Sequence, residues 1–384
     1  MAAPRAYLDW NATTPVHPAA KAAVLVALDC LGNPSSIHTE GRAARAILET
    51  ARADLAALVG GEAENVVFTS GATEAANALF RAGLSGCCGK DIACAMRPMV
   101  SAVEHAAVIA AAGVGASFVQ VDANGLVDTA ALTAMLAEGG PAMVAIQLAN
   151  NETGVVQDIP ALAGIVHAAG GALIVDAVQA PGKLPLDIKA LGADAIFLSA
   201  HKFGGPKGVG AIVFPDSRTR LAEAFIGGGG QERGQRGGTE NLTGIAGMGA
   251  AARVAREMDE AVQRMIQLRG EFENHLNRLA PDVAILSQRV SRLVNTTCFA
   301  VPGLAAERAL IAFDLDGVAV SSGSACSSGK VKASHVLTAM GMPDGVKAGA
   351  IRVSIGPTTV FDDLERCLNS LARQIQRRAK TKAA

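Results

Sequence analysis

A lysine that directly follows an apolar run is the first residue in this chain whose position suggests chemistry. Lys202 stands in Ser199-Ala-His-Lys-Phe-Gly-Gly, just after the run Ala195 to Leu198. Most lysines are solvated surface residues, and Lys202 taken alone would be interpreted as one of them. A lysine at the mouth of a buried strand, beside a histidine and before a glycine turn, can instead form a Schiff base with a carbonyl cofactor. The rest of the sequence has to decide between these interpretations.

A second motif has the pattern of a phosphate-binding turn. The segment Val66-Val-Phe-Thr-Ser-Gly-Ala-Thr-Glu74 predicts a strand, a glycine turn and a helix that begins at Thr73 or Glu74. Backbone N–H groups at a helix start are unpaired and lie at the positive end of the dipole, so they can hold a phosphate. Ser70 or Thr73 could equally act only as a helix cap. Together with Lys202, the turn indicates an aldehyde cofactor with a phosphate, and pyridoxal phosphate (PLP) is the leading candidate.

Three further residues could complete a PLP site. PLP needs an acid beside its ring nitrogen, because the protonated ring is the stronger electron sink. Asp176 ends a mostly apolar run, where a carboxylate requires a cationic partner. Gln179 could donate to the ring hydroxyl. His105 could stack on the ring, although a lone histidine is more often a packed or exposed side chain.

Cys326 is the second reactive candidate. It stands in Val320-Ser-Ser-Gly-Ser-Ala-Cys-Ser-Ser-Gly-Lys330, where small residues favour a mobile loop that reaches solvent. Lys330 and Lys332 would favour the thiolate, which is the reactive form of cysteine. On local chemistry alone, a structural role for Cys326 stays open.

Successive apolar runs explain how these residues could meet. The runs Ala142 to Leu148, Ala172 to Val175 and Ala195 to Leu198 are short, do not alternate and leave room for crossover helices. They are therefore predicted to be buried parallel strands of an α/β fold. In such a sheet, ligands bind beyond the carboxyl ends of the strands. These ends carry Asn150, Asn151, Asp176, Gln179, Ser199, His201 and Lys202.

Other patterns predict the remaining organisation. A helical region from about Gly244 to Leu279 is expected to lead from a large domain into a smaller one. The predicted strands outside the parallel set are Val66 to Phe68, Ala211 to Phe214, Asn295 to Val301 and Ala350 to Ile355, and the predicted helices are Ile159 to Ala169, Ala305 to Asp314 and Asp362 to Arg378.

Composition excludes several classes of function. A net charge of -1 gives no general attraction to nucleic acid, and the longest uncharged apolar stretch, Ala106 to Val121, is shorter than the roughly 20 residues of a membrane span. The first residues do not have the pattern of a signal peptide, so we expect a cytoplasmic protein. The 7 scattered cysteines argue against a disulfide framework, and Cys87, Cys88 and Cys94 lack the paired spacing of a metal site.

The chain closely resembles the cysteine desulfurases of the NifS/IscS type, within the class V aminotransferase group of PLP enzymes. The resemblance covers nearly the whole chain and depends on several ordered motifs at matching intervals. These motifs are Tyr7 to Pro15, Asn33 to Ser36, Thr69 to Glu74, Glu104 to His105, Asn150 to Gly154, Asp176 to Gln179, Ser199 to Lys202, Gly228 to Arg233, Gly238 to Asn241, Ser321 to Cys326 and Arg352 to Ser354.

The resemblance implies a PLP-dependent transferase of fold type I. Its large domain, 15–255, would contain a mostly parallel seven-stranded sheet. A smaller α+β domain would comprise 1–14 and 256–384 and carry the mobile cysteine loop at about 320–333.

The resemblance also implies a role for each site residue. Lys202 would form the Schiff base with PLP, His105 would stack on the ring, Asp176 would pair with the ring nitrogen and Gln179 would contact the ring hydroxyl. The implied phosphate contacts are Ala72, Thr73, Ser199 and His201, with Thr239 reaching the phosphate of the partner subunit in a homodimer. Asn151 and Arg352 would hold the substrate carboxylate.

The implied reaction is the removal of sulfur from L-cysteine, which leaves L-alanine and a persulfide on Cys326. The sulfur would pass to an iron–sulfur scaffold or another acceptor protein. No metal site is expected, except that Cys326 could transiently be a ligand of an iron–sulfur cluster. The alternatives are a selenocysteine lyase or class V aminotransferase of the same fold, and a sulfur-relay or scaffold protein that uses the fold only for binding.

Two segments depart from the family pattern. Pro357-Thr358 replaces a basic and an aromatic residue, and Lys330-Val-Lys-Ala-Ser334 stands where an acidic residue and a proline are frequent. Both departures concern acceptor docking and loop behaviour rather than the chemistry of Lys202.

Overall fold

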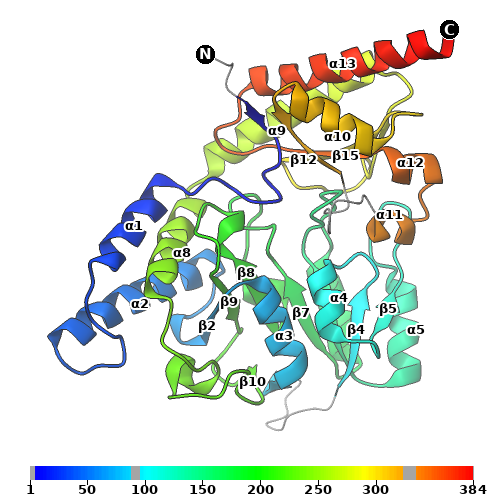
Figure 1. Cartoon of the computed structure of the whole chain (residues 1–384). Coiled ribbons are helices and arrows are strands. Elements are labelled where there is room, and N and C mark those ends of the chain that lie inside the picture. Colours follow the sequence, from blue (N-terminus) through cyan, green and yellow to red (C-terminus); the bar gives the residue numbers. More distant parts are fainter. Residues whose placement is uncertain (1–4, 88–95, 323–333, 384) are drawn as a thin grey trace.

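A seven-stranded sheet forms the centre of the larger part of the molecule (Figure 1). The computed structural model describes residues 5–87, 96–322 and 334–383. The strand order in this sheet is β2-β9-β8-β7-β6-β4-β5. Its strands are β2 (Val66–Thr69), β4 (Arg97–Ser101), β5 (Ser117–Val119), β6 (Ala142–Gln147), β7 (Ala172–Asp176), β8 (Ala195–Ser199) and β9 (Gly210–Val213).

The sheet is mostly parallel, as predicted. Strands β5, β4, β6, β7 and β8 pair in parallel, and β9 runs antiparallel to both of its neighbours, β8 and β2. Every residue of β6 is buried, which explains why the strand is apolar from Ala142 to Ile146 rather than alternating. The carboxyl ends of β6, β7 and β8 therefore lie at one edge of the sheet.

Helices cover both faces of this sheet. Val144 and Ile146 of β6 pack in one buried cluster with residues of α2, α5, α6 and α8, whereas Met143 and Ala145 pack in a second cluster with residues of α3 and α4. Side chains of one strand point alternately to the two faces, so each face needs its own cover. The helices of this part are α1 (Pro18–Leu28), α2 (Thr39–Leu58), α3 (Ala72–Ala82), α4 (Ala106–Ala112), α5 (Thr129–Gly139), α6 (Ile159–Ala168), α7 (Ile188–Leu191) and α8 (Leu242–Ala255).

Short elements connect the main ones. The 3-10 turns are η1 (Ala63–Asn65), η3 (Ala200–Lys202) and η4 (Gln231–Gly234), and the two-residue strands β3 (Leu84–Ser85) and β10 (Arg220–Leu221) form an antiparallel pair.

A four-stranded antiparallel sheet organises the second part, above the large sheet in Figure 1. Its strands are β11 (Ala284–Ile285), β12 (Thr296–Ala300), β14 (Ser321–Ser322) and β15 (Ala350–Ser354). The helices here are α9 (Asp259–Leu279), α10 (Ala306–Leu315), α11 (His335–Ala339), α12 (Asp344–Gly349) and α13 (Phe361–Ala383). Phe272, Phe299 and Phe313 pack in its core, so the few aromatic residues gather where helices meet a small sheet.

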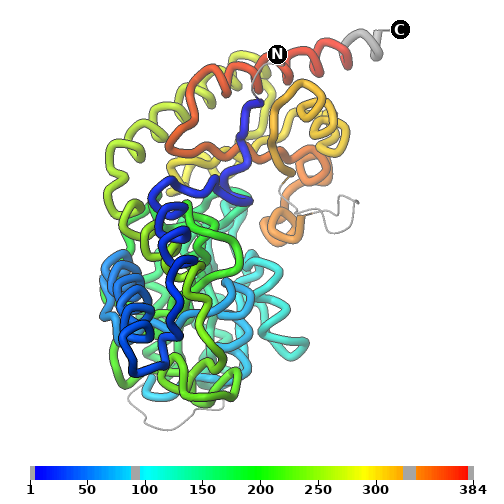
Figure 2. Tube along the Cα trace, turned by 60° about the vertical axis from the view of Figure 1, so that its left-hand side comes forward, coloured from blue at the N-terminus to red at the C-terminus, as the bar shows by residue number. Residues whose placement is uncertain are grey.

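The N-terminal segment belongs to both parts. Strand β1 (Ala6–Tyr7) pairs in parallel with β13 (Val318–Ala319), and Ala6 and Leu8 lie in the core of the second part. The segment then runs to α1 beside the large sheet, as the dark blue tube in Figure 2 shows. The domain limits 15–255 and 256–384 stay a prediction, although α8 ends at Ala255.

The predicted helical region between the two parts is confirmed as helical and is divided into two helices. The region Gly244 to Leu279 contains two helices, α8 and α9, separated by residues 256–258. The chain changes direction between them, because α8 packs on the large sheet and α9 on the small one. No pattern in this charged stretch of the sequence marks the break.

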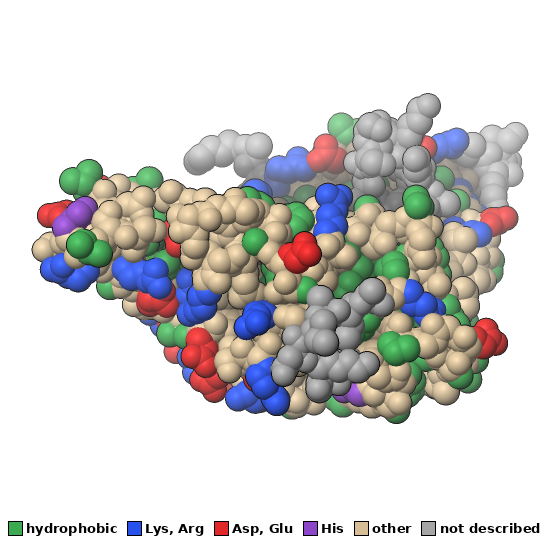
Figure 3. All heavy atoms as spheres, turned by 90° about the horizontal axis from the view of Figure 1, so that it is seen from below, with side chains coloured by type: hydrophobic (Ala, Val, Ile, Leu, Met, Phe, Trp, Pro, Cys, Tyr) green, Lys and Arg blue, Asp and Glu red, His purple; other side chains and the backbone are tan. Residues whose placement is uncertain are grey.

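The surface opposite the second part carries both signs of charge. Figure 3 shows blue lysine and arginine side chains beside red acidic ones on this face, in accord with the net charge of -1. Among the helices of the described residues, none is both long and apolar enough to cross a membrane.

Candidate active site

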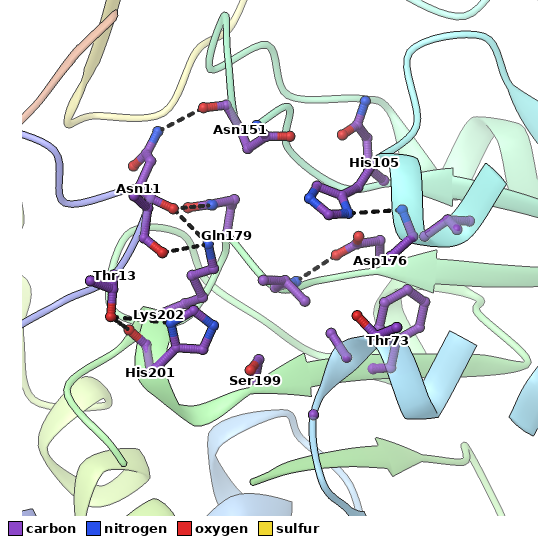
Figure 4. Close-up of a pocket in the computed structure, with 18 of the residues that line it drawn as sticks. Asn11, Thr13, Thr73, His105, Asn151, Asp176, Gln179, Ser199, His201 and Lys202 are labelled. Carbon is purple, nitrogen blue, oxygen red and sulfur yellow. Dashed lines mark hydrogen bonds between the residues drawn. The ribbon is translucent and has the colours of Figure 1, made fainter. Parts of the chain in front are cut away.

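A cavity of about 780 Å³ lies at the carboxyl ends of β6, β7 and β8. Figure 4 shows side chains from these strand ends, from α3 and from the N-terminal segment around it. The residues predicted for the site that line it are Ala72, Thr73, His105, Asn151, Asp176, Gln179, Ser199, His201, Lys202 and Arg352. Two other predicted residues are not among them. Thr239 is exposed elsewhere, and Cys326 lies outside the described residues.

Lys202 projects into this cavity from η3, the single turn that follows β8. Its Nζ donates to the carbonyl oxygens of Asn11, at 2.7 Å, and Ala12, at 2.9 Å. Burial, followed by the nearby positive charge of Arg352, lowers the pKa of Lys202 to about 8, although the carboxylates of Asp176 and Asp9 act in the opposite direction. A lysine with such a pKa exists partly as the neutral amine near neutral pH, which is the form that attacks a carbonyl.

Asp176 is the last residue of β7 and faces the same cavity. Its Oδ1 accepts a hydrogen bond from the backbone N–H of Val178 at 2.9 Å. Loss of solvation raises its pKa to about 6. The buried carboxyl of Glu104 lies close by, and both burial and the charge of Asp176 raise the pKa of Glu104 well above its usual range. Two carboxyl groups in one poorly solvated place favour the binding of a cationic group.

His105 is the N-cap residue of α4. Its Nδ1 accepts a hydrogen bond from the backbone N–H of Ala107 at 3.1 Å. The ring therefore carries its proton on Nε2 when it is neutral. Desolvation, followed by the charges of Lys202 and His335, lowers the pKa of His105. The cavity thus contains a neutral, flat imidazole at the end of a short helix.

The turn between β2 and α3 forms an anion cradle. Helix α3 begins at Ala72, with Gly71 as its N-cap, so neither proposed cap, Ser70 or Thr73, occupies that position. Gly71 has no side chain that could bond to the N–H groups of the first turn, and these groups stay available to a ligand.

Strand β9 allows the turn between β2 and α3 to approach it closely. A Cβ atom on Gly210 of β9 would lie 2.6 Å from the carbonyl oxygen of Leu198 and 2.7 Å from the Cα of Gly71. Such contacts are too short for any side chain, so glycine is required there. Ser199 and His201 line the cavity beside the same turn.

Arg352 reaches the cavity from β15 of the small sheet. Its Nη2 pairs with Asp9 Oδ1 at 2.6 Å, and its Nη1 donates to the carbonyl oxygen of Asn151 at 2.9 Å. Its Nε is buried and has no hydrogen-bond partner among the described residues. Nη1 and Nη2 each carry a second N–H, so a guanidinium held in this way still has donors for a carboxylate ligand.

Comparisons with known proteins agree with this arrangement. The model of the aminotransferase class-V family matches residues 6–367. A cysteine desulfurase of Cereibacter sphaeroides is 39% identical over 376 residues, which cover 96% of this chain and 95% of that protein. The cysteine desulfurase IscS of Dictyoglomus turgidum is 37% identical and is covered to 94%, over 97% of this chain. The chain belongs to the cysteine desulfurases of the class-V aminotransferase family.

Solved structures of related proteins have the same fold. A NifS-like protein of Rickettsia africae superposes with a TM-score of 0.86 at 34% identity, over 96% of this chain and 99% of that one. A structure described as SspA in complex with cysteine superposes with a TM-score of 0.76 at 27% identity, over 92% of this chain and 99% of that one. The predicted resemblance and the fold class are therefore confirmed.

The residues of this cysteine desulfurase fit the PLP on which its family depends. The cavity offers an amine on Lys202, a buried carboxyl on Asp176 that forms no ion pair within the described part of the chain, and the first-turn N–H groups of α3. These groups match the aldehyde, the ring nitrogen and the phosphate of the cofactor.

Sequence reasoning missed the residues of the N-terminal segment. Asp9, Asn11 and Thr13 line the cavity, and Thr13 Oγ1 lies 3.2 Å from His201 Nδ1. The only available signal was the motif Tyr7 to Pro15, which was used for the resemblance without a role for its side chains. Contacts over some 190 residues of sequence cannot be read from local patterns.

Proposed function

We propose that this protein is an L-cysteine desulfurase that binds PLP through Lys202 and carries the removed sulfur on Cys326. The observation that supports this proposal best is the position of Lys202. Its amine, with a pKa lowered to about 8, lines one cavity with Asp176 and the turn of α3. No other arrangement of groups in the described residues combines an amine, a buried acid and an anion cradle.

Each residue then has a defined task. PLP, when bound, withdraws electrons from the α-carbon of the substrate amino acid. Asp176 would hold the ring N–H, and Arg352 would bind the substrate carboxylate with its guanidinium, because its side chain lines the cavity. Lys202, once released from the cofactor, would move the α-proton, because a neutral amine of lowered pKa is an effective base.

Sulfur transfer would complete the reaction. The thiolate of Cys326 forms a bond to the sulfur of the substrate as the carbon–sulfur bond breaks. The electron pair of that bond stays with the carbon, which takes up a proton and leaves as part of alanine. The protein retains the sulfur as a persulfide, so the atoms of one cysteine become alanine and one bound sulfur.

The active assembly would be a homodimer in the cytoplasm. Thr239 is exposed and does not line the cavity of its own chain, as a residue that serves a partner's phosphate would be. Leu25, Val26 and Leu28 of α1 are also more than half exposed, at 54%, 65% and 63%. Apolar side chains gathered on one helix favour an interface between copies. The sulfur acceptor would be an iron–sulfur scaffold or another acceptor protein.

The test is incubation of the PLP-loaded protein with L-cysteine. We expect equal amounts of alanine and released or bound sulfur, and a gain of one sulfur on the peptide that contains Cys326. Cys326→Ala should abolish sulfur release, whereas the matched control Cys30→Ala should not. Lys202→Ala should remove the borohydride-reducible chromophore.

Other outcomes would point to the alternatives. Sulfide release by Cys326→Ala, or alanine without sulfur on the peptide, would favour a selenocysteine lyase or an aminotransferase. Absence of the chromophore from the PLP-treated wild type would favour a sulfur-relay protein that uses the fold only for binding.

A further inference from the structure

Lys183 is a buried lysine that no step of the proposed reaction uses. It lies between β7 and α7 and is only 8% exposed. A buried ammonium normally pairs with a carboxylate, yet in the part of the chain that the structure describes Lys183 forms no ion pair. The charged groups that act on it are Lys202 of η3 and Arg352 of β15, and both are cations. Its position therefore needs another explanation.

The two side-chain hydrogen bonds that the structure gives Lys183 both go to one residue of the site. Its Nζ donates to Gln179 Oε1 at 3.0 Å and to the carbonyl oxygen of Gln179 at 3.2 Å. An ammonium has only donors, so it can face only the oxygen of the amide. The nitrogen of the Gln179 amide must then face the opposite way.

The other side of the amide meets the active-site network. Gln179 Nε2 donates to the carbonyl oxygen of Asn11 at 3.0 Å, and the same oxygen accepts from Lys202 Nζ at 2.7 Å. Figure 4 shows Gln179 and Lys202 meeting at Asn11 in this way. The amide nitrogen has a second N–H, which remains available to a ligand in the cavity that Gln179 lines.

We propose that Lys183 is a positioning residue that holds the Gln179 amide with its nitrogen toward the cofactor ring, and that its charge stabilises the anionic form of the ring oxygen. The proposal rests on the proposed function, because Gln179 contacts that oxygen only when PLP occupies the cavity. Two hydrogen bonds fix the orientation of the Gln179 amide: the ammonium of Lys183 donates to its oxygen, and the carbonyl of Asn11 accepts from its nitrogen.

The surroundings of Lys183 strengthen this effect. A second cavity of about 210 Å³ lies beside it, lined mainly by apolar residues that include Phe203, Met258 and Pro357, with His17 at its border. Desolvation in this place lowers the pKa of Lys183 to about 7. In such poorly solvated surroundings a charge acts over a longer distance than in water, and a polarised amide donates a stronger hydrogen bond. An anionic oxygen next to Gln179 would in turn favour the charged form of Lys183.

The test follows the pH midpoint of the visible absorption band of the PLP-loaded protein. Loss of a proton makes the bound cofactor more negative, so a nearby cation lowers this midpoint. Lys183→Met should therefore raise it by about one pH unit, the order of shift expected when one unit charge is removed from a partly polar interior. The matched control Lys189→Met removes a lysine whose side chain is 56% exposed and should leave the midpoint unchanged.

A second variant separates the charge from the packing. Lys183→Gln removes the charge, still offers an N–H to the Gln179 amide and should raise the midpoint as well. Gln179→Leu should also raise the pH midpoint. In the Gln179→Leu background, Lys183→Met should change the midpoint by less than it does in the wild type, because both residues act on one oxygen.

Each outcome has a distinct meaning. An unchanged midpoint in the Lys183 variants that bind PLP, or in Gln179→Leu, would overturn this proposal while the proposed function stands. If the wild type forms no visible band with PLP, the proposed function itself fails.

Discussion

Replacing Asp176 by asparagine should affect the cofactor-free protein and the loaded enzyme in opposite directions. The folded protein raises the pKa of Asp176 from 3.8 to about 6, because the carboxylate loses its water. A shift of about 2 units corresponds to about 3 kcal/mol of destabilisation by the ionised form. Asparagine does not ionise, and its Oδ1 can still accept the hydrogen bond from Val178.

The size and the pH range of this effect follow from the shift. The additional N–H groups of asparagine lack a partner, which costs about 1–2 kcal/mol, so the cofactor-free variant should be about 1–2 kcal/mol more stable than the wild type at pH 7. An acid whose folded pKa is raised loses stability as the pH rises from its unfolded to its folded pKa. The difference between the two proteins should therefore grow between about pH 4 and pH 6 and then stay constant.

The loaded enzyme should respond in the opposite way. Asp176→Asn would leave the ring N–H of PLP without its charged partner, and removal of one partner of a buried pair costs about 3–5 kcal/mol. We expect alanine production to fall at least about 100-fold.

The assay combines urea unfolding of the cofactor-free proteins at several pH values with alanine production by the loaded ones. Asp128→Asn, at the exposed N-cap of α5, is the matched control, because asparagine caps a helix as well as aspartate does. A variant that is less stable than the wild type at pH 7, or a stability difference that does not vary with pH, would refute the reasoning.

Two further changes test the scaffold. Gly210→Ala should weaken PLP binding at least about tenfold in an absorbance titration, because the added methyl group overpacks the site by about 1–3 kcal/mol and would push the turn before α3 away from β9. In the control Gly270→Ala, the added Cβ meets no atom within 4 Å, and PLP binding should stay intact. Arg52→Met should cost about 3–5 kcal/mol in urea unfolding, because it leaves Glu232 buried without its ion pair at 2.7 Å. Arg253→Met, at a surface pair, should cost less than about 1 kcal/mol, and equal losses at both sites would contradict this difference.

Local patterns predicted five strands of the large sheet, β2, β6, β7, β8 and β9, and missed β4 and β5. The limits of β6, β7 and β8 agree with the predicted runs within a residue or two, because strands buried on both faces are apolar without interruption. Strand β4 begins with Arg97 and Pro98, and only its last three residues are buried, so its sequence does not have this pattern. Strand β5, at the edge of the sheet, is only three residues long. Edge strands bury less surface and show a weaker signal.

The apolar runs also left the direction of β9 open. The run Ala211 to Phe214 was predicted as a strand, but the structure shows that it runs antiparallel between two parallel neighbours. Only a few residues separate η3 from β9, which is too short for the crossover that a parallel strand requires. The connection length contained this information, and apolar runs alone did not.

The sequence by itself determined which residues stand at the ends of the parallel strands, and hence that Asp176, Gln179 and Lys202 would share one edge of a sheet. This was possible because strand burial and glycine turns leave local patterns. Only the tertiary structure decided what surrounds them. Lys202 meets Asn11 across 191 positions, and Arg352 meets Asp9 across 343. These contacts depend on how the N-terminal segment and the small sheet pack against the large one, and no local pattern specifies that packing.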